Sequence, residues 1–285
     1  MKKILCLIFA LALLCAAAAF GDELPGLSIH FFENGKADAI LLREGNSTVL
    51  IDTGFPEKAE ALAQRLRELG VTSIDKLIIS HYDRDHVGGA ALLVRSFDVQ
   101  EVIGPDYRQK SEALSQLKEE LKSRDLKLSR LRQEKELQVG SMDITLYPAK
   151  KHTGMVPNNS SIICSVTYGK TSFLFTGDAL ETRMKDFNRK NNRQFTLIKL
   201  PHHGIFLRKS AEFKKLLSAT QPQYGIATNS PAFAIDQDLA LMLEIYCLKL
   251  YETKNGELTV TSNGETLTIT QSEPRLPQSS PAAES

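Results

Sequence analysis

The sequence concentrates its metal-binding side chains in one stretch, His81-Tyr82-Asp83-Arg84-Asp85-His86-Val87-Gly88-Gly89. This stretch follows an apolar segment, 76–80, that is typical of a strand, and it precedes a helical pattern over 87–97. On a regular helix His81 and Asp83 would face apart, whereas a loop after a strand can turn alternate side chains toward one point. Imidazoles and carboxylates are usual zinc ligands, and carboxylate-rich sets also suit manganese. The stretch therefore predicts a metal site, with a solvated charged turn as the alternative.

Two later motifs place ligands at the ends of other apolar strands. Phe173-Leu174-Phe175-Thr176-Gly177-Asp178 ends in a carboxylate that can bridge two cations, although alone it could be a turn-forming residue. Ile198-Lys199-Leu200-Pro201-His202-His203-Gly204 ends in paired imidazoles that are hard to explain as surface residues. Together the three motifs predict one metal centre built from His81, Asp83, Asp85, His86, Asp178, His202 and His203, with the ligating member of the histidine pair left open.

Strand and helix patterns alternate around these motifs. Apolar and polar residues alternate from 27 to 52 with breaks at Asn34-Gly35 and Gly45-Asn46, which predicts antiparallel strands. We expect further strands at 99–103, 142–147, 161–168, 172–176, 224–228, 258–262 and 266–270. Helices are expected at 57–70, 87–97, 107–138, 211–219 and 238–248. This recurrence favours an α/β fold of two mixed sheets covered by helices, a four-layer αββα sandwich, over other mixed α/β folds.

The composition and the two ends suggest an exported globular protein. The chain has 285 residues and a formal net charge of +1, so its overall charge indicates no polyanionic partner. Lys2-Lys3, an apolar run and a cluster of alanines predict a signal peptide over residues 1–21, with lipidation at Cys15 as an alternative. One domain is expected over 22–272, and a disordered tail over 273–285. Cys164 and Cys247 are expected as buried free thiols.

The order of the motifs resembles the metallo-β-lactamase superfamily. More narrowly, it is similar to the hydrolase domain of ComEC-type DNA-uptake proteins and their stand-alone secreted relatives. The resemblance runs from Leu27 to Thr270 and has Asp83 where the superfamily usually has a histidine, which makes the first site richer in oxygen. The matching segments are Asp38-Ala39, Ile51-Asp52-Thr53-Gly54, the His81 loop, Asn158 with Ser161, Gly177-Asp178 and His202-His203-Gly204.

The resemblance implies a ligand set and roles within it. One cation would be held by His81, Asp83 and Asp178 with help from Asn158. The other would be held by Asp85, His86, Asp178 and one histidine of the His202-His203 pair. Asp85, His86 and Asp178 would act in catalysis, while Asp52, Asn158 and Ser161 would support the ligands. The implied cofactor is Zn²⁺, as one or two ions, with Mn²⁺ as the alternative.

The resemblance also implies an activity and a location. The chain would be a periplasmic or extracellular phosphodiesterase or nuclease that uses a metal-activated water on DNA or another phosphoester. Two alternatives stay open, a lactone or lactam hydrolase and a non-catalytic, metal-stabilised binding module that is accessory to DNA uptake. No stretch after the signal is apolar for long enough to form a transmembrane channel. One basic run predicts either phosphate contacts or a solvated helix face, and it comprises Arg183, Lys185, Arg189, Lys190 and Arg193.

Overall fold

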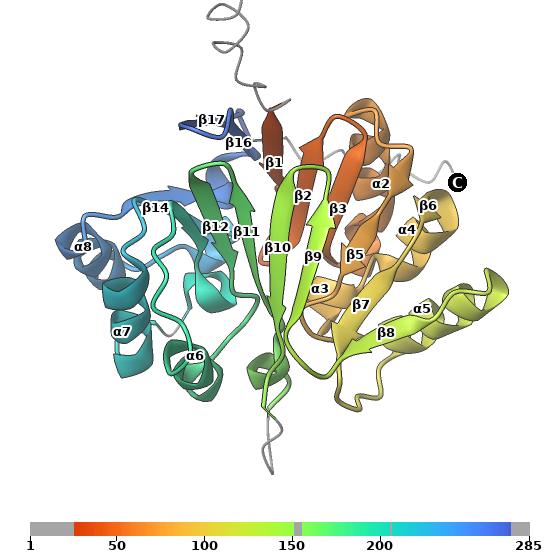
Figure 1. The fold of residues 1–285 in the computed structure, drawn as a ribbon, viewed down its shortest axis with the longest axis horizontal. Coiled ribbons are helices and arrows are strands. Elements are labelled where there is room, and N and C mark those ends of the chain that lie inside the picture. The colour runs from red at the N-terminus through yellow and green to blue at the C-terminus, as the bar shows by residue number, and fades with distance from the viewer. Residues whose placement is uncertain (1–25, 151–155, 206, 275–285) are drawn as a thin grey trace, which may run out of the picture.

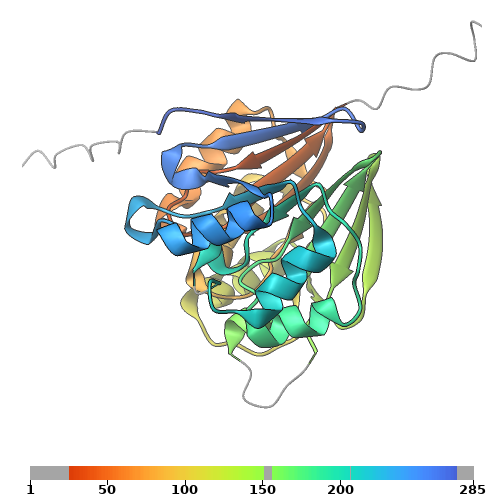
Figure 2. The same ribbon diagram turned by 90° about the vertical axis from the view of Figure 1, so that its left-hand side faces the viewer.

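Two β-sheets pack face to face and carry helices on their outer faces, as Figures 1 and 2 show. The arrangement comes from a computed structural model that describes residues 26–150, 156–205 and 207–274. The predicted four-layer αββα sandwich is confirmed. Mixed sheets are confirmed as well, because each sheet contains both parallel and antiparallel pairs.

The first sheet has eight strands in the order β17-β16-β1-β2-β3-β5-β7-β8. Its strands pair antiparallel from β17 to β3 and parallel from β3 to β8. Their bounds are β1 Leu27–Phe31, β2 Ala39–Glu44, β3 Ser47–Thr53, β5 Lys76–Ile78, β7 Val102–Pro105, β8 Leu128–Leu131, β16 Leu258–Ser262 and β17 Leu267–Gln271. The short strands β4 (Ser73–Ile74) and β6 (Asp98–Val99) pair with each other.

The second sheet has seven strands in the order β15-β14-β13-β12-β11-β10-β9. Pairing is antiparallel from β9 to β12 and parallel from β12 to β15. The bounds are β9 Lys135–Val139, β10 Met142–Tyr147, β11 Ile163–Tyr168, β12 Thr171–Phe175, β13 Leu197–Lys199, β14 Tyr224–Ala227 and β15 Lys249–Glu252. Parallel strands in each sheet bring several carboxyl ends to one edge, and this is where the ligand motifs lie.

Three apolar layers hold the sandwich together. Between the sheets, Phe31 of β1 and Phe175 of β12 belong to the central core, with ring centroids 6.1 Å apart. Outside the first sheet lie α2 (Ala59–Glu68), α4 (Ala90–Ser96) and α5 (Glu112–Ser123), and outside the second lie α6 (Glu181–Asn188), α7 (Ala211–Thr220) and α8 (Gln237–Ile245). Short helical turns are α3 Arg84–Val87, η1 Pro56–Lys58, η2 Pro157–Ser160, η3 Pro201–Gly204, η4 Pro231–Phe233 and η5 Thr253–Asn255.

The long helix predicted over 107–138 is wrong in its second half. Only α5 is helical there, and the left-handed backbone of Asp125 (φ 55°) turns the chain into β8 and then β9. The last strand of the second sheet is β9, and it carries Lys135, Glu136 and Gln138. Charged side chains protect an edge strand from pairing with other chains, and they also make its sequence look helical. The expectation of two buried thiols is wrong for Cys247, which is exposed, while Cys164 is buried.

The predicted signal peptide over residues 1–21 and most of the predicted tail lie outside the described residues. Within the described ranges, no helix is both long enough and apolar enough to cross a bilayer. The domain bounds 22–272 stay a prediction.

Candidate metal centre

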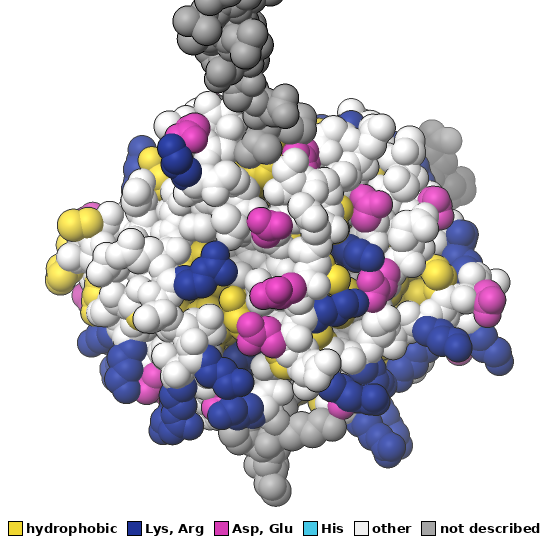
Figure 3. Space-filling model, in the orientation of Figure 1, with side chains coloured by type: hydrophobic (Ala, Val, Ile, Leu, Met, Phe, Trp, Pro, Cys, Tyr) yellow, Lys and Arg dark blue, Asp and Glu magenta, His cyan; other side chains and the backbone are white. Residues whose placement is uncertain are grey.

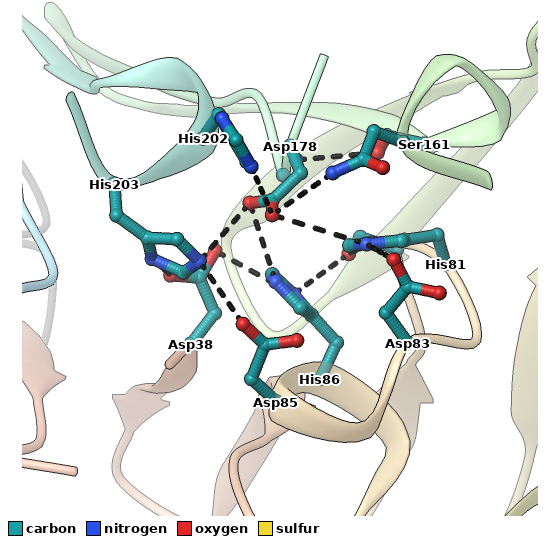
Figure 4. Close-up of polar contacts among 12 residues, drawn as sticks. Asp38, His81, Asp83, Asp85, His86, Ser161, Asp178, His202 and His203 are labelled. Carbon is teal, nitrogen blue, oxygen red and sulfur yellow. Dashed lines mark hydrogen bonds and ion pairs between the residues drawn. The ribbon is translucent and has the colours of Figure 1, made fainter. Parts of the chain in front are cut away.

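The ligand motifs of both sheets meet at one edge of the sandwich (Figure 4). The loop after β5 carries His81, and the short helix α3 that follows carries His86. From the second sheet, Asp178 follows β12, and the His202-His203 pair follows β13. These segments are distant in sequence, so the site exists only when the two sheets are packed together.

Asp178 lies at the centre, and each of its carboxylate oxygens faces a different pair of histidines. Its Oδ1 is 3.2 Å from His86 Nε2 and 3.4 Å from His203 Nε2. Its Oδ2 is 3.9 Å from His81 Nε2 and 3.8 Å from His202 Nε2. Asp178 is therefore placed between two groups of potential ligands.

Each group contains a further carboxylate. Asp83 Oδ2 lies 3.4 Å from His81 Nε2, and Asp85 Oδ2 lies 3.6 Å from His203 Nε2. The group around Asp178 Oδ1 is the more compact one, because one potential ligand atom from each of its members lies within 4.8 Å of the others. These members are Asp85, His86, Asp178 and His203.

The backbone of η3 separates the two histidines of the pair. Both His202 (φ 49°, ψ 46°) and His203 (φ 56°, ψ 15°) are left-handed, a conformation that side chains with a Cβ rarely adopt. Gly204 continues at φ 87°, where a Cβ would lie 2.0 Å from Ile235 Cδ1. This strained turn directs His202 to one oxygen of Asp178 and His203 to the other.

The donor atoms fit a divalent cation. The Nε2 atoms of His81, His86 and His203 and the Oδ1 atom of Asp178 are buried and make no hydrogen bond, although they approach one another closely. Buried polar atoms without a partner are costly unless something else satisfies them. Imidazole nitrogens and carboxylate oxygens are ligands for zinc and similar ions, so this cluster could bind a metal.

Asp52 lies behind the ligands and holds His86. Its Oδ2 is 2.8 Å from His86 Nδ1, and its Oδ1 accepts the backbone N–H of Ser80. The Ser80 hydroxyl also donates to Asp52 and lies 3.1 Å from His81 Nδ1. A partner at Nδ1 sets the tautomer of a histidine that ligates through Nε2. Asp52 and Ser80 thus orient the histidines of the first motif.

A buried ion pair lies on the Nδ1 side of the His203 ring and supports it. Lys199, fully buried on β13, places its Nζ 2.5 Å from Asp38 Oδ2 and 3.1 Å from the Gly177 carbonyl oxygen. Asp38 also accepts from the Thr228 hydroxyl, which is 3.1 Å from His203 Nδ1. These contacts fix the far side of the His203 ring.

Asn158, Ser161 and Gln109 position the carboxylates. Asn158 Nδ2 lies 3.4 Å from Asp178 Oδ2, and the Ser161 hydroxyl accepts the Asp178 backbone N–H. Gln109 Nε2 donates to Asp83 Oδ1, and the hydroxyl of Tyr107 donates to Gln109 Oε1. The loop after β7 therefore holds in place the loop after β5, which carries His81 and Asp83.

The electrostatics of the cluster favour a bound cation. Burial raises the pKa of the Asp178 carboxyl, but His203 and His86 hold it well below its usual range. Burial likewise opposes ionisation of Asp85, whose pKa is nevertheless lowered by His203, His86 and Lys36. Burial lowers the pKa of His203, but the Asp178 carboxylate raises it to about 9. These directions keep the Asp178 and Asp85 carboxylates ionised at neutral pH, and such negative charge among imidazoles attracts a cation.

The structure brings all seven sequence-predicted ligands together, and it gives the members of the predicted basic run different surroundings. Arg183 is buried, and it donates from Nε to the Ser161 carbonyl and from Nη2 to the Tyr147 carbonyl. The Arg183 guanidinium is therefore structural and offers no phosphate contact. Lys185, Arg189 and Lys190 are exposed on and just after α6.

The residues of the centre that sequence reasoning missed include Lys36, Ser80, Gln109, Lys199 and Thr228. Lys199 had a usable signal, because it is a lone charge in an apolar strand just before the histidine pair. Gln109 and Thr228 had none, since their importance comes from contacts with ligands more than 20 positions away in the sequence.

A family model described as "Metallo-beta-lactamase superfamily" matches residues 33–222, more than half of the chain. Among solved structures, the metallo-beta-lactamase fold protein YhfI from Bacillus subtilis superimposes with a TM-score of 0.51. That match has 13% sequence identity and covers 80% of this chain and 97% of YhfI, so it shows a shared fold.

Two curated proteins are similar in sequence. Recombination protein 2 of Haemophilus influenzae is 25% identical over 228 residues, which cover 78% of this chain and 27% of that protein. Competence protein ComA of Neisseria gonorrhoeae is 24% identical over 212 residues, which cover 73% of this chain and 28% of that protein. The chain thus matches little more than a quarter of the length of each relative.

Proposed function

Because the chain belongs to the metallo-β-lactamase superfamily, we propose that it is an exported, metal-dependent hydrolase of phosphoesters, with DNA as the first substrate to test. The observation that carries this proposal is the position of Asp178, whose two oxygens face two groups of histidine and aspartate ligands. Two cations that share a carboxylate suit phosphoester cleavage, because they can stabilise both the attacking and the leaving oxygen.

Three features support a phosphoester substrate. The relatives are named for competence and recombination, which makes DNA a reasonable candidate. Three carboxylates among the seven ligands provide the oxygen-rich coordination expected of a phosphoryl-transfer site. Figure 3 shows Lys and Arg side chains along the lower part of one face. Lys185 of α6 and Lys190, just after this helix, are exposed. Such charges attract a nucleic-acid backbone.

The proposed cofactor is Zn²⁺, as one or two ions, with Mn²⁺ as the alternative. Asp85, His86, Asp178 and His203 would hold one ion, since these four form the compact group. His81, Asp83 and Asp178 would hold the other, with His202 on the same side of Asp178. Both members of the histidine pair would then serve the centre, one on each side.

The chain's own residues define the proposed mechanism. A bound cation supplies an acidified water and a positive charge for the developing oxyanion. Asp85, at the edge of the cluster, would orient that water and accept its proton. His86 is held through its Nδ1 by Asp52, so its ring cannot turn away during the reaction. Asn158 would keep the Asp178 carboxylate in the orientation in which its two oxygens face the two groups of histidines.

Turnover on three substrate classes tests the activity. We expect the zinc- or manganese-loaded protein to hydrolyse bis-p-nitrophenyl phosphate and single-stranded DNA, and to leave nitrocefin and a panel of lactones intact. Turnover of nitrocefin or a lactone alone would overturn the phosphoesterase proposal. A metal-loaded protein that hydrolyses none of these substrates would point to a non-catalytic binding module.

Export is a separate part of the proposal. It is supported by Lys2-Lys3, by the apolar run that follows, and by the alanines from Ala16 to Ala19. Fractionation followed by N-terminal sequencing should find a mature protein outside the cytoplasm that begins near residue 20 or 22. A full-length cytosolic protein would contradict export and leave the enzymatic proposal intact.

A further inference from the structure

Lys36 places a positive charge at the mouth of the metal centre. Its Nζ lies 2.9 Å from Asp85 Oδ2, and its side chain is 23% exposed. The same carboxylate oxygen lies 3.6 Å from His203 Nε2, inside the compact ligand group. Lys36 thus contacts the carboxylate that the proposed mechanism assigns to the attacking water.

The loop that carries Lys36 is fixed to the ligand segments. The backbone N–H of Asp38 donates to the Asp85 carbonyl, and the N–H of Gly54 donates to the Asp38 carbonyl. The Lys36 ammonium also lies 5.9 Å from the ring centroid of Phe233, an aromatic side chain of η4 that is 48% exposed. Backbone and side-chain contacts therefore hold this ammonium at the edge of the site.

The centre needs such a charge if it is to accept an anion. Five aspartates lie in or directly behind the cluster, namely Asp38, Asp52, Asp83, Asp85 and Asp178. They repel a phosphodiester, which is itself negatively charged. Lys199 cannot contact substrate, because it is fully buried and paired with Asp38. Among the residues that the structure describes, Lys36 is the lysine that both pairs with a carboxylate of the cluster and has a partly exposed side chain.

We propose that Lys36 contacts the anionic oxygen of the substrate and makes this carboxylate-rich site selective for anionic phosphoesters. A carboxylate oxygen has two lone pairs, so Asp85 can accept from Lys36 while it also serves a cation. An anion bound beside Asp85 would come within reach of the ammonium, and a charge-assisted hydrogen bond would strengthen its binding. This inference rests on the proposed function, and it names the anionic oxygen as the feature that Lys36 recognises.

Replacement of Lys36 by methionine tests the inference, because methionine keeps much of the side-chain volume and removes the charge. In zinc-loaded Lys36→Met we expect the dissociation constant for inorganic phosphate, measured by calorimetry, to rise at least about tenfold. Bound zinc should equal or exceed that of the parent, since a cation next to the ligands has been removed. Lys36→Arg should restore much of the phosphate binding.

Lys76→Met is the matched control. Lys76 is 24% exposed and forms an equivalent ion pair, with its Nζ 2.8 Å from Glu101 Oε2. This pair lies where β5 begins, and the ligand loop follows the other end of that strand. We expect Lys76→Met to bind phosphate like the parent.

The outcomes separate this inference from the proposed function. Unchanged phosphate binding in Lys36→Met, or an absence of phosphate binding by the parent, would overturn the role of Lys36. Loss of zinc from Lys36→Met would also overturn it, because Lys36 would then support the ligands. If the parent binds phosphate through Lys36 but hydrolyses no phosphodiester, the anion site stands and the proposed activity fails. If the parent and Lys36→Met hydrolyse phosphodiesters equally fast, the proposed activity stands and the proposed role of Lys36 fails.

Discussion

At the level of single residues, Asp178 and Asp85 have distinguishable expected roles. Asp178 faces all four histidines, so Asp178→Ala should lose metal and activity together. Asp85→Asn should keep some bound metal but lose about 10²-fold or more in turnover, because the water loses its orienting carboxylate. Metal analysis beside bis-p-nitrophenyl phosphate hydrolysis measures both effects. Parental rates in both variants would place the catalytic centre elsewhere.

Asp52 acts through His86, and its effect should appear in metal affinity. Asp52→Asn keeps the shape but weakens the partner of His86 Nδ1, so zinc should bind about 10- to 100-fold more weakly. Competition with a chromogenic chelator gives the affinity. Asp143, exposed on β10, provides the control, because Asp143→Asn leaves these contacts intact. Equal affinity in Asp52→Asn and the parent would show that Ser80 alone suffices to orient the ring.

At the level of secondary structure, a buried guanidinium, that of Arg183, joins α6 to the end of β10 and to the segment before β11. Arg183→Met would leave the carbonyls of Ser161 and Tyr147 without their donor. We expect the free energy of unfolding to fall by about 2–4 kcal/mol. Urea denaturation measures this loss, and Lys185→Met, on the exposed side of α6, should change stability by less than about 0.5 kcal/mol. A similar small change in Arg183→Met would show that water replaces the guanidinium.

Glu257, just before β16, pairs with His30 of β1 and with Arg65 of α2. The stability that these contacts provide should depend on pH. Burial raises the pKa of Glu257, but His30 and Arg65 lower it below the ordinary value of 4.5. The carboxylate therefore stabilises the fold above pH 4.5, and this contribution is lost as the pH falls below that value. Glu257→Gln should destabilise the protein most at pH 7 and much less at pH 3.5, as urea denaturation at the two values would show.

The exposed Glu60 on α2 is the control for this measurement. Glu60→Gln should shift stability equally at both pH values. If Glu257→Gln also does so, the Arg65 pair contributes nothing to folding, as is common for ion pairs near the surface.

At the scale of the whole molecule, metal binding and folding should be coupled, because the ligands come from both sheets. His81 and His86 follow a strand of the first sheet, whereas Asp178 and His203 follow strands of the second. A hundredfold excess of free zinc over its dissociation constant should add about 2.7 kcal/mol of stability. Calorimetry should show a higher unfolding temperature with zinc than with EDTA, and Asp178→Ala should lose most of the difference. Equal temperatures for the parent would exclude a site shared between the sheets.

Much of the architecture could be predicted because its signals are local. The strands at 142–147 and 258–262 have the predicted bounds, since each alternates apolar and polar residues over most of its length. β8 and β9 could not be predicted, because their charged side chains lie on exposed edges, where helix and strand patterns look alike. Cys247 was misjudged for a similar reason, since an apolar neighbourhood in sequence does not show which side of the chain faces the core.

The sequence by itself determined which chemical groups form the candidate centre, because each ligand follows an apolar strand within a short motif. Only the tertiary structure decided how those groups are arranged. β12 and β13 must pair before Asp178 can separate His202 from His203, and the two sheets must pack before His81 and His86 can face that carboxylate. The loop before β2 must fold onto α3 before Lys36 can reach Asp85, 49 positions away. Arg183 is buried in spite of its basic neighbours, because it reaches from α6 to the carbonyls of Ser161 and Tyr147. Ligand identity is a local property of the chain, whereas burial, pairing and charge balance arise from contacts between distant segments.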